Sequence, residues 1–258
     1  MKKYILDLVV SSVQSLSDKH VLLRLTTGGQ PLPEIVPGQF VEVRIDGAGH
    51  TFLRRPISIN FVDKTTNELW LLVAMVGEGT RRLGSLQCGD TINCVLPLGN
   101  GFSCLSSSAS HLLVGGGVGV APLLYLGAEL QSNGVQPTFL LGGRSAKDLL
   151  ELDEFQKSGR VFVTTEDGSM GERGFVTDHS LLRTEAFDMI HTCGPTPMMK
   201  AVARYAVGNG IACEASLENM MACGLGACLC CVEKTVDGNL CVCKEGPVFN
   251  VKQLLWQI

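Results

Sequence analysis

The 258-residue sequence has no excess of positive charge: 25 aspartate and glutamate residues outnumber 21 lysine and arginine residues, for a formal net charge of −4. A nucleic-acid-binding protein would need a basic surface, so this balance argues against such a partner. Charged residues are also scarce, at 18 %, whereas apolar residues reach 45 %. That composition argues against disorder and predicts a chain that buries a core.

Long apolar runs are missing as well. The longest uncharged apolar stretch, LLVGGGVGVAPLLYLGA at residues 112–128, is short for a membrane span and contains five glycines and a proline. We interpret it as a buried strand, a glycine loop and a helix. The N-terminal residues have two lysines but neither the apolar run nor the cleavage site of a secretory signal, so a soluble cytoplasmic protein is expected.

Recognisable catalytic motifs are also absent. The five histidines show no metal-protease spacing, and no Ser–His–Asp or paired-carboxylate arrangement can be assigned. We therefore expect each histidine to be a surface or core residue, and no catalytic residue is predicted. These histidines are His20, His50, His111, His179 and His191.

The sequence is rich in cysteine and glycine. Eleven cysteines, an odd number without an export signal, do not suggest a disulfide framework. Six of them crowd into the 21 residues from Cys223 to Cys243, and such a concentration of thiols in a reducing compartment indicates a metal site.

The cysteine spacing points to iron. Cys223, Cys228 and Cys231 form C-x4-C-x2-C, and a fourth cysteine follows at Cys241 or Cys243. This spacing is typical of plant-type [2Fe–2S] centres, for which thiolates are soft, anionic ligands. The glycines of CGLGAC suit a loop whose N–H groups point at the sulfurs.

A structural zinc site is the alternative, because Cys228, Cys231, Cys241 and Cys243 could form a four-thiolate tetrahedron. Zinc sites usually consist of two short pairs, however, and this one would leave Cys223 unused. We therefore favour the iron–sulfur centre. Cys230 and Cys241 lie beside the predicted ligands and could be mistaken for them.

Three segments with different patterning follow one another. Residues 1–104 contain six short alternating runs separated by turn clusters, which predict an antiparallel β-barrel. In residues 105–210, apolar runs alternate with helix-like stretches, which predicts an α/β domain with a parallel sheet. Residues 211–258 hold the cysteine loop and short strands, so we expect a multidomain β plus α/β fold with a small C-terminal cluster domain.

Two motifs in the first segment suit a phosphate-bearing ligand. In LRRPISI, two arginines precede Pro56, a residue that belongs at a sheet edge or opening. Such an arginine fork can hold a pyrophosphate, and Ser58 on the other strand face can reach a ring system; the alternative is a solvated surface pair. The GEGT stretch at residues 77–80 opens a predicted helix and suits either a phosphate contact or an ordinary turn with a threonine N-cap.

The second segment has glycines where strands end. GGGVGVAP, residues 115–122, joins a strand to a helix but lacks the G-x-G-x-x-G pattern, so a tight packing turn is the alternative to a nucleotide loop. Later strand ends carry GGR (142–144), EDGS (166–169) and CGP (193–195). Ligands of open α/β sheets bind beyond the carboxyl ends of the strands, so the set predicts a nucleotide site.

Taken in order, RRPISI, GEGT, PLGNGF, GGGVGVAPLL and CGPTPMM, followed by the cysteines, resemble the ferredoxin–NADP reductase superfamily. LENMMACGLGACLCC…CVCKEGPVF is similar, more closely, to the electron-transfer subunit of class 1B, NAD-dependent dihydroorotate dehydrogenase. The resemblance covers the whole chain, and the cysteine segment is its most specific part. It implies an FAD-binding barrel, an NAD-binding α/β domain and a [2Fe–2S] tail.

The resemblance also implies roles for individual residues. The K-[DE]-G-P-V-F motif places the fourth cluster ligand at Cys243, whereas Cys230 departs from the small residue common in the family. Separately, Glu166 or Asp167 could accept ribose hydroxyls and repel a 2′-phosphate, which favours NAD over NADP, although Arg144 and Arg173 weaken that argument. The implied FAD contacts are Arg55, Pro56, Ile57, Ser58, Gly79 and Thr80; the implied NAD contacts are Gly116, Gly117, Gly119, Pro122, Cys193 and Gly194.

Nothing in the chain suggests a (β/α)8 barrel, so dihydroorotate oxidation would occur on a separate chain. The resemblance implies an FMN-containing catalytic subunit, a heterotetramer with two copies of each chain, and a place in pyrimidine biosynthesis. Electrons would pass from that partner through the cluster and FAD to NAD+, since a flavin exchanges electrons both singly and in pairs. Hydride transfer needs orientation more than an acid or base, which agrees with the missing catalytic motif.

Two rival hypotheses remain. An NADH:ferredoxin or sulfide-linked reductase subunit shares the order of modules but resembles a different cysteine segment. A non-catalytic zinc-stabilised adaptor, or a redox-sensing binding module, predicts a colourless protein, whereas the flavin and iron–sulfur enzyme should be yellow-brown.

Overall fold

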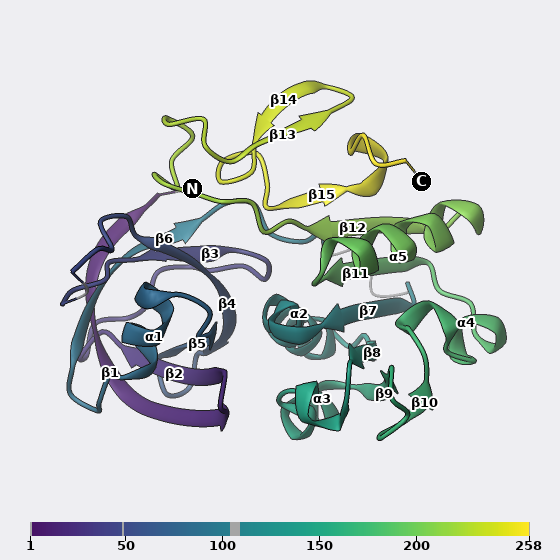
Figure 1. The fold of residues 1–258 in the computed structure, drawn as a ribbon, viewed down its shortest axis with the longest axis horizontal. Coiled ribbons are helices and arrows are strands. Elements are labelled where there is room, and N and C mark those ends of the chain that lie inside the picture. The colour runs from purple at the N-terminus through teal and green to yellow at the C-terminus, as the bar shows by residue number, and fades with distance from the viewer. Residues whose placement is uncertain (1, 48, 104–108, 258) are drawn as a thin grey trace. The chain divides into compact units, whose positions relative to one another are not determined.

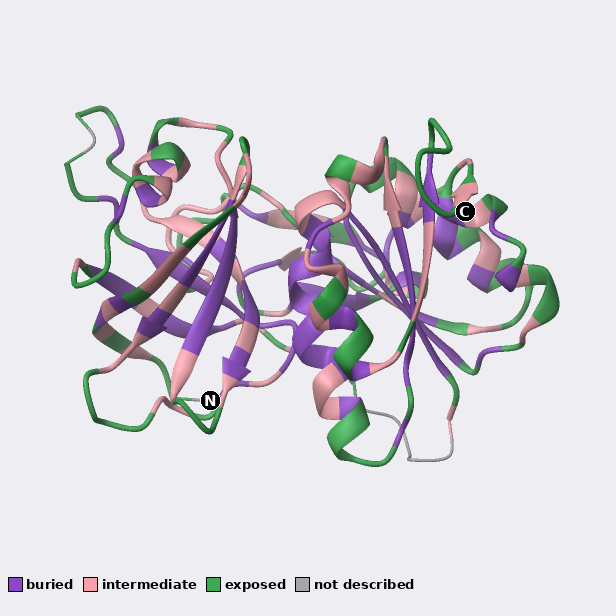
Figure 2. Cartoon of the chain, turned by 90° about the horizontal axis from the view of Figure 1, so that it is seen from below, coloured by how far each residue is buried: buried purple, intermediate pink, exposed green. Residues whose placement is uncertain are grey.

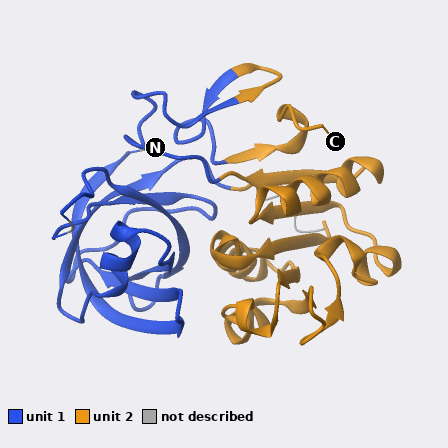
Figure 3. Cartoon of the chain, in the orientation of Figure 1, with its two compact units in different colours: residues 1–101, 218–233, 239–247 blue, residues 102–217, 234–238, 248–258 orange. Residues whose placement is uncertain are grey.

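The computed structural model describes residues 2–47, 49–103 and 109–257 (Figure 1). The chain forms two compact units (Figure 3). The barrel unit consists of residues 1–101, 218–233 and 239–247, and the sheet unit of residues 102–217, 234–238 and 248–258. The boundary predicted between residues 104 and 105 lies outside the described residues.

The barrel unit contains the expected closed antiparallel barrel, with strand order β1-β2-β5-β4-β3-β6. Most positions of its strands are buried, including five consecutive residues of β5, and Leu23, Ile59 and Leu71 are fully buried. One short helix, α1, connects β5 to β6. The elements are β1 (Tyr4–Ser17), β2 (His20–Thr26), β3 (Phe40–Val43), β4 (Arg55–Asp63), β5 (Glu68–Ala74), α1 (Glu78–Gly84) and β6 (Thr91–Leu98).

The sheet unit is built on a seven-stranded sheet of order β10-β9-β8-β7-β11-β12-β15. All neighbouring strands run parallel except β12 and β15, which are antiparallel. The elements are β7 (His111–Gly116), α2 (Ala121–Ser132), β8 (Thr138–Gly143), α3 (Leu152–Ser158), β9 (Arg160–Thr165), β10 (Glu172–Arg173), α4 (Leu181–Thr184), β11 (Met189–Cys193), α5 (Thr196–Gly208), β12 (Ala212–Ser216) and β15 (Val248–Asn250).

The apolar stretch at residues 112–128 folds as expected into β7, a 3-10 turn (Gly117–Val120) and most of α2. Every residue of β7 is buried, as is typical of a central parallel strand with both faces covered (Figure 2). Among the described residues, no helix has the length and apolar character needed to cross a membrane.

The cysteine-rich segment has little regular structure. After a run of turns it forms a two-stranded sheet of β13 (Val232–Thr235) and β14 (Gly238–Cys241). All four predicted cluster ligands belong to the barrel unit. β13, β14 and β15 confirm the short strands expected in this segment.

Candidate functional site

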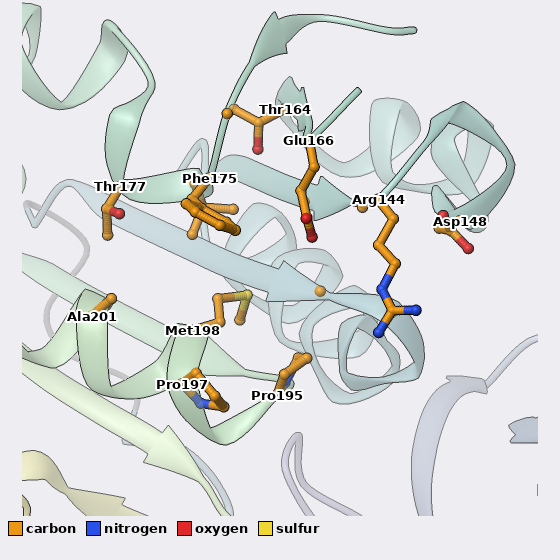
Figure 4. A pocket seen from close by; sticks show the side chains of 16 residues that line it. Arg144, Asp148, Thr164, Glu166, Phe175, Thr177, Pro195, Pro197, Met198 and Ala201 are labelled. Carbon is orange, nitrogen blue, oxygen red and sulfur yellow. The ribbon is translucent and has the colours of Figure 1, made fainter. Parts of the chain in front are cut away.

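The carboxyl ends of β7, β8 and β9 border a cleft of about 510 Å³ within the sheet unit (Figure 4). The start of α5 closes another side of the cleft with Pro197 and Met198. Because parallel neighbours end at the same edge, residues of all four predicted strand-end clusters (GGGVGVAP, GGR, EDGS and CGP) line the cleft. Of the predicted NAD contacts, the cleft is lined by Gly116, Gly117 and Glu166, and its lining does not include Gly119, Pro122, Asp167, Cys193 or Gly194.

Two of these residues instead hold the cleft's backbone together. A Cβ on Gly119 would lie 2.4 Å from the Cα of Gly194, and a Cβ on Gly194 would lie 2.9 Å from the carbonyl oxygen of Gly116. Gly194 also has a φ of +149°, which L side chains rarely adopt. Pro122 lies in the first turn of α2, where its fixed φ suits the helix start. The glycine loop thus has both a ligand-facing part and a packing part.

The structure separates the two acidic residues that the sequence could not tell apart. Glu166 lines the cleft, whereas the Asp167 carboxylate accepts hydrogen bonds from the Ser169 backbone N–H at 2.9 Å and hydroxyl at 2.6 Å. Those two bonds lower the pKa of Asp167. Arg144 lines the cleft as well, and in Figure 4 Glu166 stands between Arg144 and Phe175.

Phe175 is a cleft residue that sequence reasoning missed. Its side chain is 63 % exposed although it is aromatic, and it borders the cleft beside Thr177. The Phe175 backbone N–H donates to the Asp178 carboxylate at 2.9 Å, which fixes the turn after Gly174. An exposed aromatic ring on a fixed turn is a suitable platform for a flat ligand group. The signal in the sequence was a glycine followed directly by an aromatic residue.

In the barrel unit, the R-P-I-S stretch forms the first four residues of β4. β3 pairs with it from Arg55 to Ser58, but β5 pairs with β4 only from Ile59 onward. The ladders between these strands therefore leave one side of residues 55–58 unpaired, and Pro56 lies at a strand opening as its missing N–H requires.

The two adjacent arginines have different roles. Arg54 is half-buried, and its Nη1 donates to the backbone oxygens of Glu42 at 3.2 Å and Asn93 at 2.9 Å, so it supports the barrel wall. Arg55 lies against α1, because a Cβ on Gly79 would stand 3.2 Å from the Arg55 Nε. Of the two arginines of the expected fork, Arg54 is thus held by the barrel wall.

Thr80 completes the entry to α1. Its hydroxyl oxygen accepts the backbone N–H groups of Val76 and Gly77, both at 3.1 Å. The sequence allowed an ordinary turn with a threonine N-cap here, but the N-cap is Gly77, and Thr80 lies in the first turn of α1. The absence of a side chain at Gly79 leaves the space that Arg55 occupies.

The four predicted cluster ligands lie in one loop region of the barrel unit. N–H groups point at three of the four sulfurs: Leu225 N donates to Cys223 Sγ at 3.3 Å, Gly226 N to Cys243 Sγ at 3.1 Å, and Cys243 N to Cys231 Sγ at 3.4 Å. Gly224 and Gly226 have φ of +65° and +80°, which turn this backbone toward the sulfurs.

The thiols associate in two pairs. Cys223 hydrogen-bonds with Cys228, and Cys231 with Cys243. Burial opposes ionisation of Cys223, but hydrogen bonds from backbone N–H groups and from Cys228 lower its pKa to about 6. Within the described parts of the chain, no three or more His, Cys, Asp or Glu side chains converge on one point as ligands of a single metal ion would.

The two neighbouring cysteines differ from these pairs. Cys230 is exposed, and the Cys241 sulfur lies 3.9 Å from the carbonyl oxygen of Gly226. The Cys241 N–H donates to the Glu245 carboxylate at 2.8 Å. The Cys241 sulfur thus donates to a carbonyl oxygen, whereas Cys223, Cys231 and Cys243 have sulfurs that accept backbone N–H groups.

A buried carboxyl group lies next to the cysteine loop. Glu42 on β3 is 1 % exposed, and neither carboxyl oxygen has a hydrogen-bond partner among the described residues. Burial raises the pKa of Glu42 to about 7 against the lowering effect of Arg54, and the charge of Cys223 raises it further. The burial of this carboxyl was not expected from the sequence pattern of β3.

A pair of buried histidines was also missed. His111 Nδ1 and His191 Nε2 lie 3.0 Å apart, with the two rings parallel. Glu214 lies 3.4 Å from His191 Nδ1. Burial, and next the charge of His191, lower the pKa of His111 to about 4, although Asp188 and Glu214 oppose this. These are core histidines, as expected, but they are not isolated.

Comparisons with known proteins find relatives of both the cysteine segment and the sheet unit. Residues 218–255 match the family described as the iron-sulfur cluster binding domain of dihydroorotate dehydrogenase B, and residues 113–204 match the oxidoreductase NAD-binding domain. A solved structure of an NADH-dependent reduced ferredoxin-NADP oxidoreductase is 31 % identical with a TM-score of 0.84, covering 97 % of this chain and 90 % of that one. The ferredoxin reductase of carbazole 1,9a-dioxygenase, 17 % identical with a TM-score of 0.68 over 82 % of this chain and 67 % of that one, shares the fold.

Curated relatives cover nearly the whole chain. The "Dihydroorotate dehydrogenase B (NAD(+)), electron transfer subunit" of Listeria monocytogenes serotype 4a is 40 % identical over 253 residues, which are 96 % of this chain and 98 % of that protein. The protein of the same name from Fusobacterium nucleatum is 43 % identical over 222 residues, 83 % of this chain and 84 % of that one. The chain therefore belongs to the family of electron transfer subunits of NAD-dependent dihydroorotate dehydrogenase B.

Proposed function

We propose that this subunit passes electrons from a dihydroorotate-oxidising partner chain through a [2Fe–2S] cluster and FAD to NAD+. When bound, the cluster supplies one-electron transfer, and NAD+ serves as the hydride acceptor. FAD links the two, because a flavin exchanges electrons both singly and in pairs. The observation that carries the proposal is the pairing of four thiols in a glycine loop that belongs to the same unit as the R-P-I-S stretch.

The thiol pairs suit a two-iron centre. In a [2Fe–2S] cluster four cysteines divide between two irons, so no three ligands need to converge on one point. Cys223 and Cys228 would hold one iron, and Cys231 and Cys243 the other. The N–H groups of Leu225 and Gly226 would then stabilise the negative charge on the sulfurs. A mononuclear zinc site would instead need the four thiols to converge on one ion.

The first residues of β4 would hold FAD. Arg55 beside Gly79 supplies a cation for the pyrophosphate, and Gly79 leaves the room that the guanidinium needs. Pro56 and Ile57 would line the flavin along the side of β4 that β5 leaves unpaired, and Ser58 would contact the ring system. Thr80 would act indirectly, by fixing the turn that carries Gly79.

NAD would occupy the cleft of the sheet unit. Gly116 and Gly117 would allow the pyrophosphate to approach the backbone, and Glu166 would accept the ribose hydroxyls. Phe175 would stack on the adenine. Cys193 and Gly194 would border the nicotinamide, and the contacts of Gly119 and Pro122 with the backbone and α2 would keep the loop in place. The chain's own contribution to hydride transfer is then orientation, which requires no acid or base.

The partner would be an FMN-containing catalytic subunit, joined in a heterotetramer of two copies of each chain. This assembly, its cytoplasmic location and its place in pyrimidine biosynthesis stay predictions. The names of the relatives in Listeria and Fusobacterium support an electron-transfer role in dihydroorotate dehydrogenase B.

The first test is a native pull-down of this chain, followed by an assay of dihydroorotate-dependent NAD+ reduction. Co-purification of a flavoprotein with that activity is the expected result. Capture of a different redox enzyme without dihydroorotate activity would favour an NADH:ferredoxin or sulfide-linked reductase, a possibility supported by the 31 % identical solved structure.

A pair of cysteine variants tests the path itself. Cys228→Ser is expected to abolish dihydroorotate-dependent NAD+ reduction while sparing NADH oxidation by an artificial acceptor. Cys230→Ser, a change at an exposed neighbour outside the thiol pairs, is the matched control and should retain both activities. Unchanged activities in Cys228→Ser would rule out electron flow through the cluster.

A further inference from the structure

Glu42 has no function in the proposed electron path, yet its position is unusual. A carboxyl that is 1 % exposed and has no hydrogen-bond partner within the described residues costs folding free energy. An apolar side chain of similar size would remove that cost. The position is therefore better explained by an effect of the carboxyl on its surroundings than by stability.

The surroundings of Glu42 are the cysteine loop. A Cβ on Gly224 would lie 2.7 Å from the Glu42 Cγ and 3.3 Å from its Oε1, so the carboxyl packs directly against the Gly224 backbone. Leu98 covers the same point from β6, since its Cδ1 would stand 2.9 Å from that Cβ. Gly224 follows Cys223 in the chain, and the absence of a side chain there brings the loop onto the barrel wall.

The other neighbours of Glu42 are on β4. Glu42 is the register partner of Pro56, in the stretch proposed to hold FAD. The Arg54 guanidinium, which donates to the Glu42 backbone oxygen, is the cation that acts most strongly on the carboxyl. The carboxyl thus stands between two segments to which redox cofactors are assigned, in a site where charges are weakly screened.

We propose that the Glu42 carboxyl sets the reduction potential of the cluster held by the loop from Cys223 to Cys243. This inference rests on the proposed function. A negative charge beside an electron carrier disfavours the reduced state and so lowers the potential, whereas the Arg54 cation acts in the opposite direction. Glu42 is in this sense a tuning residue, with no ligand role.

The test compares Glu42→Gln with wild type in the purified complex. The cluster's midpoint potential is measured at pH 8.5 by redox titration followed by electron paramagnetic resonance. Gln keeps the shape and removes the charge, so a shift to a more positive potential is expected. Glu34→Gln removes the same charge from an exposed position of the barrel unit and should leave the potential unchanged, because solvent screens it.

Packing and charge are distinguished by Glu42→Asp, which keeps the charge and should stay closer to the wild-type potential than Glu42→Gln does. Equal shifts of the potential in the two variants, or an unchanged potential in Glu42→Gln, would overturn the inference. If the cluster's paramagnetic resonance signal is normal in those samples, the proposed electron path is unaffected by that result. A wild-type complex without a cluster signal would overturn both. If Glu42→Gln loses the cluster, Glu42→Leu replaces it as a second uncharged variant of similar size. A more positive potential is expected there too, and an unchanged potential would overturn the inference.

Discussion

Gly119 and Gly194 pack so closely that a Cβ on Gly119 would lie 2.4 Å from the Cα of Gly194. Gly119 belongs to the turn between β7 and α2, and Gly194 follows β11, the neighbouring parallel strand. The atoms that a Cβ on Gly119 would meet are backbone atoms, which cannot move aside as a flexible side chain can. The position of the nucleotide loop over the sheet thus depends on the absence of a side chain at residue 119.

Gly119→Ala is therefore expected to push the two turns apart. We expect it to destabilise the protein by about 1–3 kcal/mol, the usual cost of overpacking, and to weaken NADH binding at least several-fold. Thermal unfolding and NADH titration measure the two effects. Gly208→Ala is the matched control, because a Cβ on Gly208 meets nothing within 4 Å. Normal NADH affinity in Gly119→Ala would show that the glycine contact does not position the loop.

The His111–His191 pair predicts a pH-dependent stability. The pKa of His111 is lowered to about 4 in the folded protein, whereas an unfolded chain takes up this proton near pH 6.5. The contribution of neutral His111 is complete above pH 6.5 and is lost as the pH falls from 6.5 toward 4. Between pH 7.5 and 5.0 this group should reduce the free energy of unfolding by about 2 kcal/mol.

Urea unfolding midpoints at the two pH values test this expectation. His111→Asn removes the titrating group and should flatten the pH dependence relative to wild type. His50→Asn, a change at an exposed histidine, should leave the wild-type dependence unaltered. An equally steep loss of stability in wild type and His111→Asn would assign the effect to other groups.

The sequence predicted the strand-end cleft because it depends on local patterns and on one topological rule. Each apolar run of residues 105–210 ends in glycine or polar residues, and parallel pairing necessarily brings those ends to one edge. The six barrel strands were visible for the same reason, as their alternation is local.

The missed features depend on contacts between distant residues. Glu42 occupies a polar position in its strand, and the cysteine loop, about 180 residues later in the chain, packs against its carboxyl group. His111 and His191 are joined by the pairing of β7 with β11. The difference between Glu166 and Asp167 is local by contrast: Ser169, two residues along the chain, donates to the Asp167 carboxylate, and only Glu166 of the two lines the cleft.

Phe175 should contribute to NADH binding through its ring. Stacking of a base on an aromatic side chain contributes about 1–3 kcal/mol, so Phe175→Leu is expected to raise the NADH dissociation constant by roughly 5- to 150-fold. Phe175→Tyr keeps the ring and should bind nearly as wild type does. Fluorescence titration with NADH gives both values. If Phe175→Leu binds NADH normally, the adenine does not contact this residue.

The position of Glu166 in the cleft predicts discrimination between the two dinucleotides. Its carboxylate can accept ribose hydroxyls and repels a 2′-phosphate, whereas Arg144 in the same cleft attracts that phosphate. Wild type should therefore prefer NADH to NADPH in acceptor-linked oxidation. Glu166→Gln should raise kcat/KM for NADPH by about tenfold, equivalent to roughly 1.4 kcal/mol of removed repulsion. Asp167→Asn is the control, because Asp167 does not line the cleft. Equal wild-type efficiencies with NADH and NADPH, or equal effects of the two variants, would show that Glu166 does not select the cofactor.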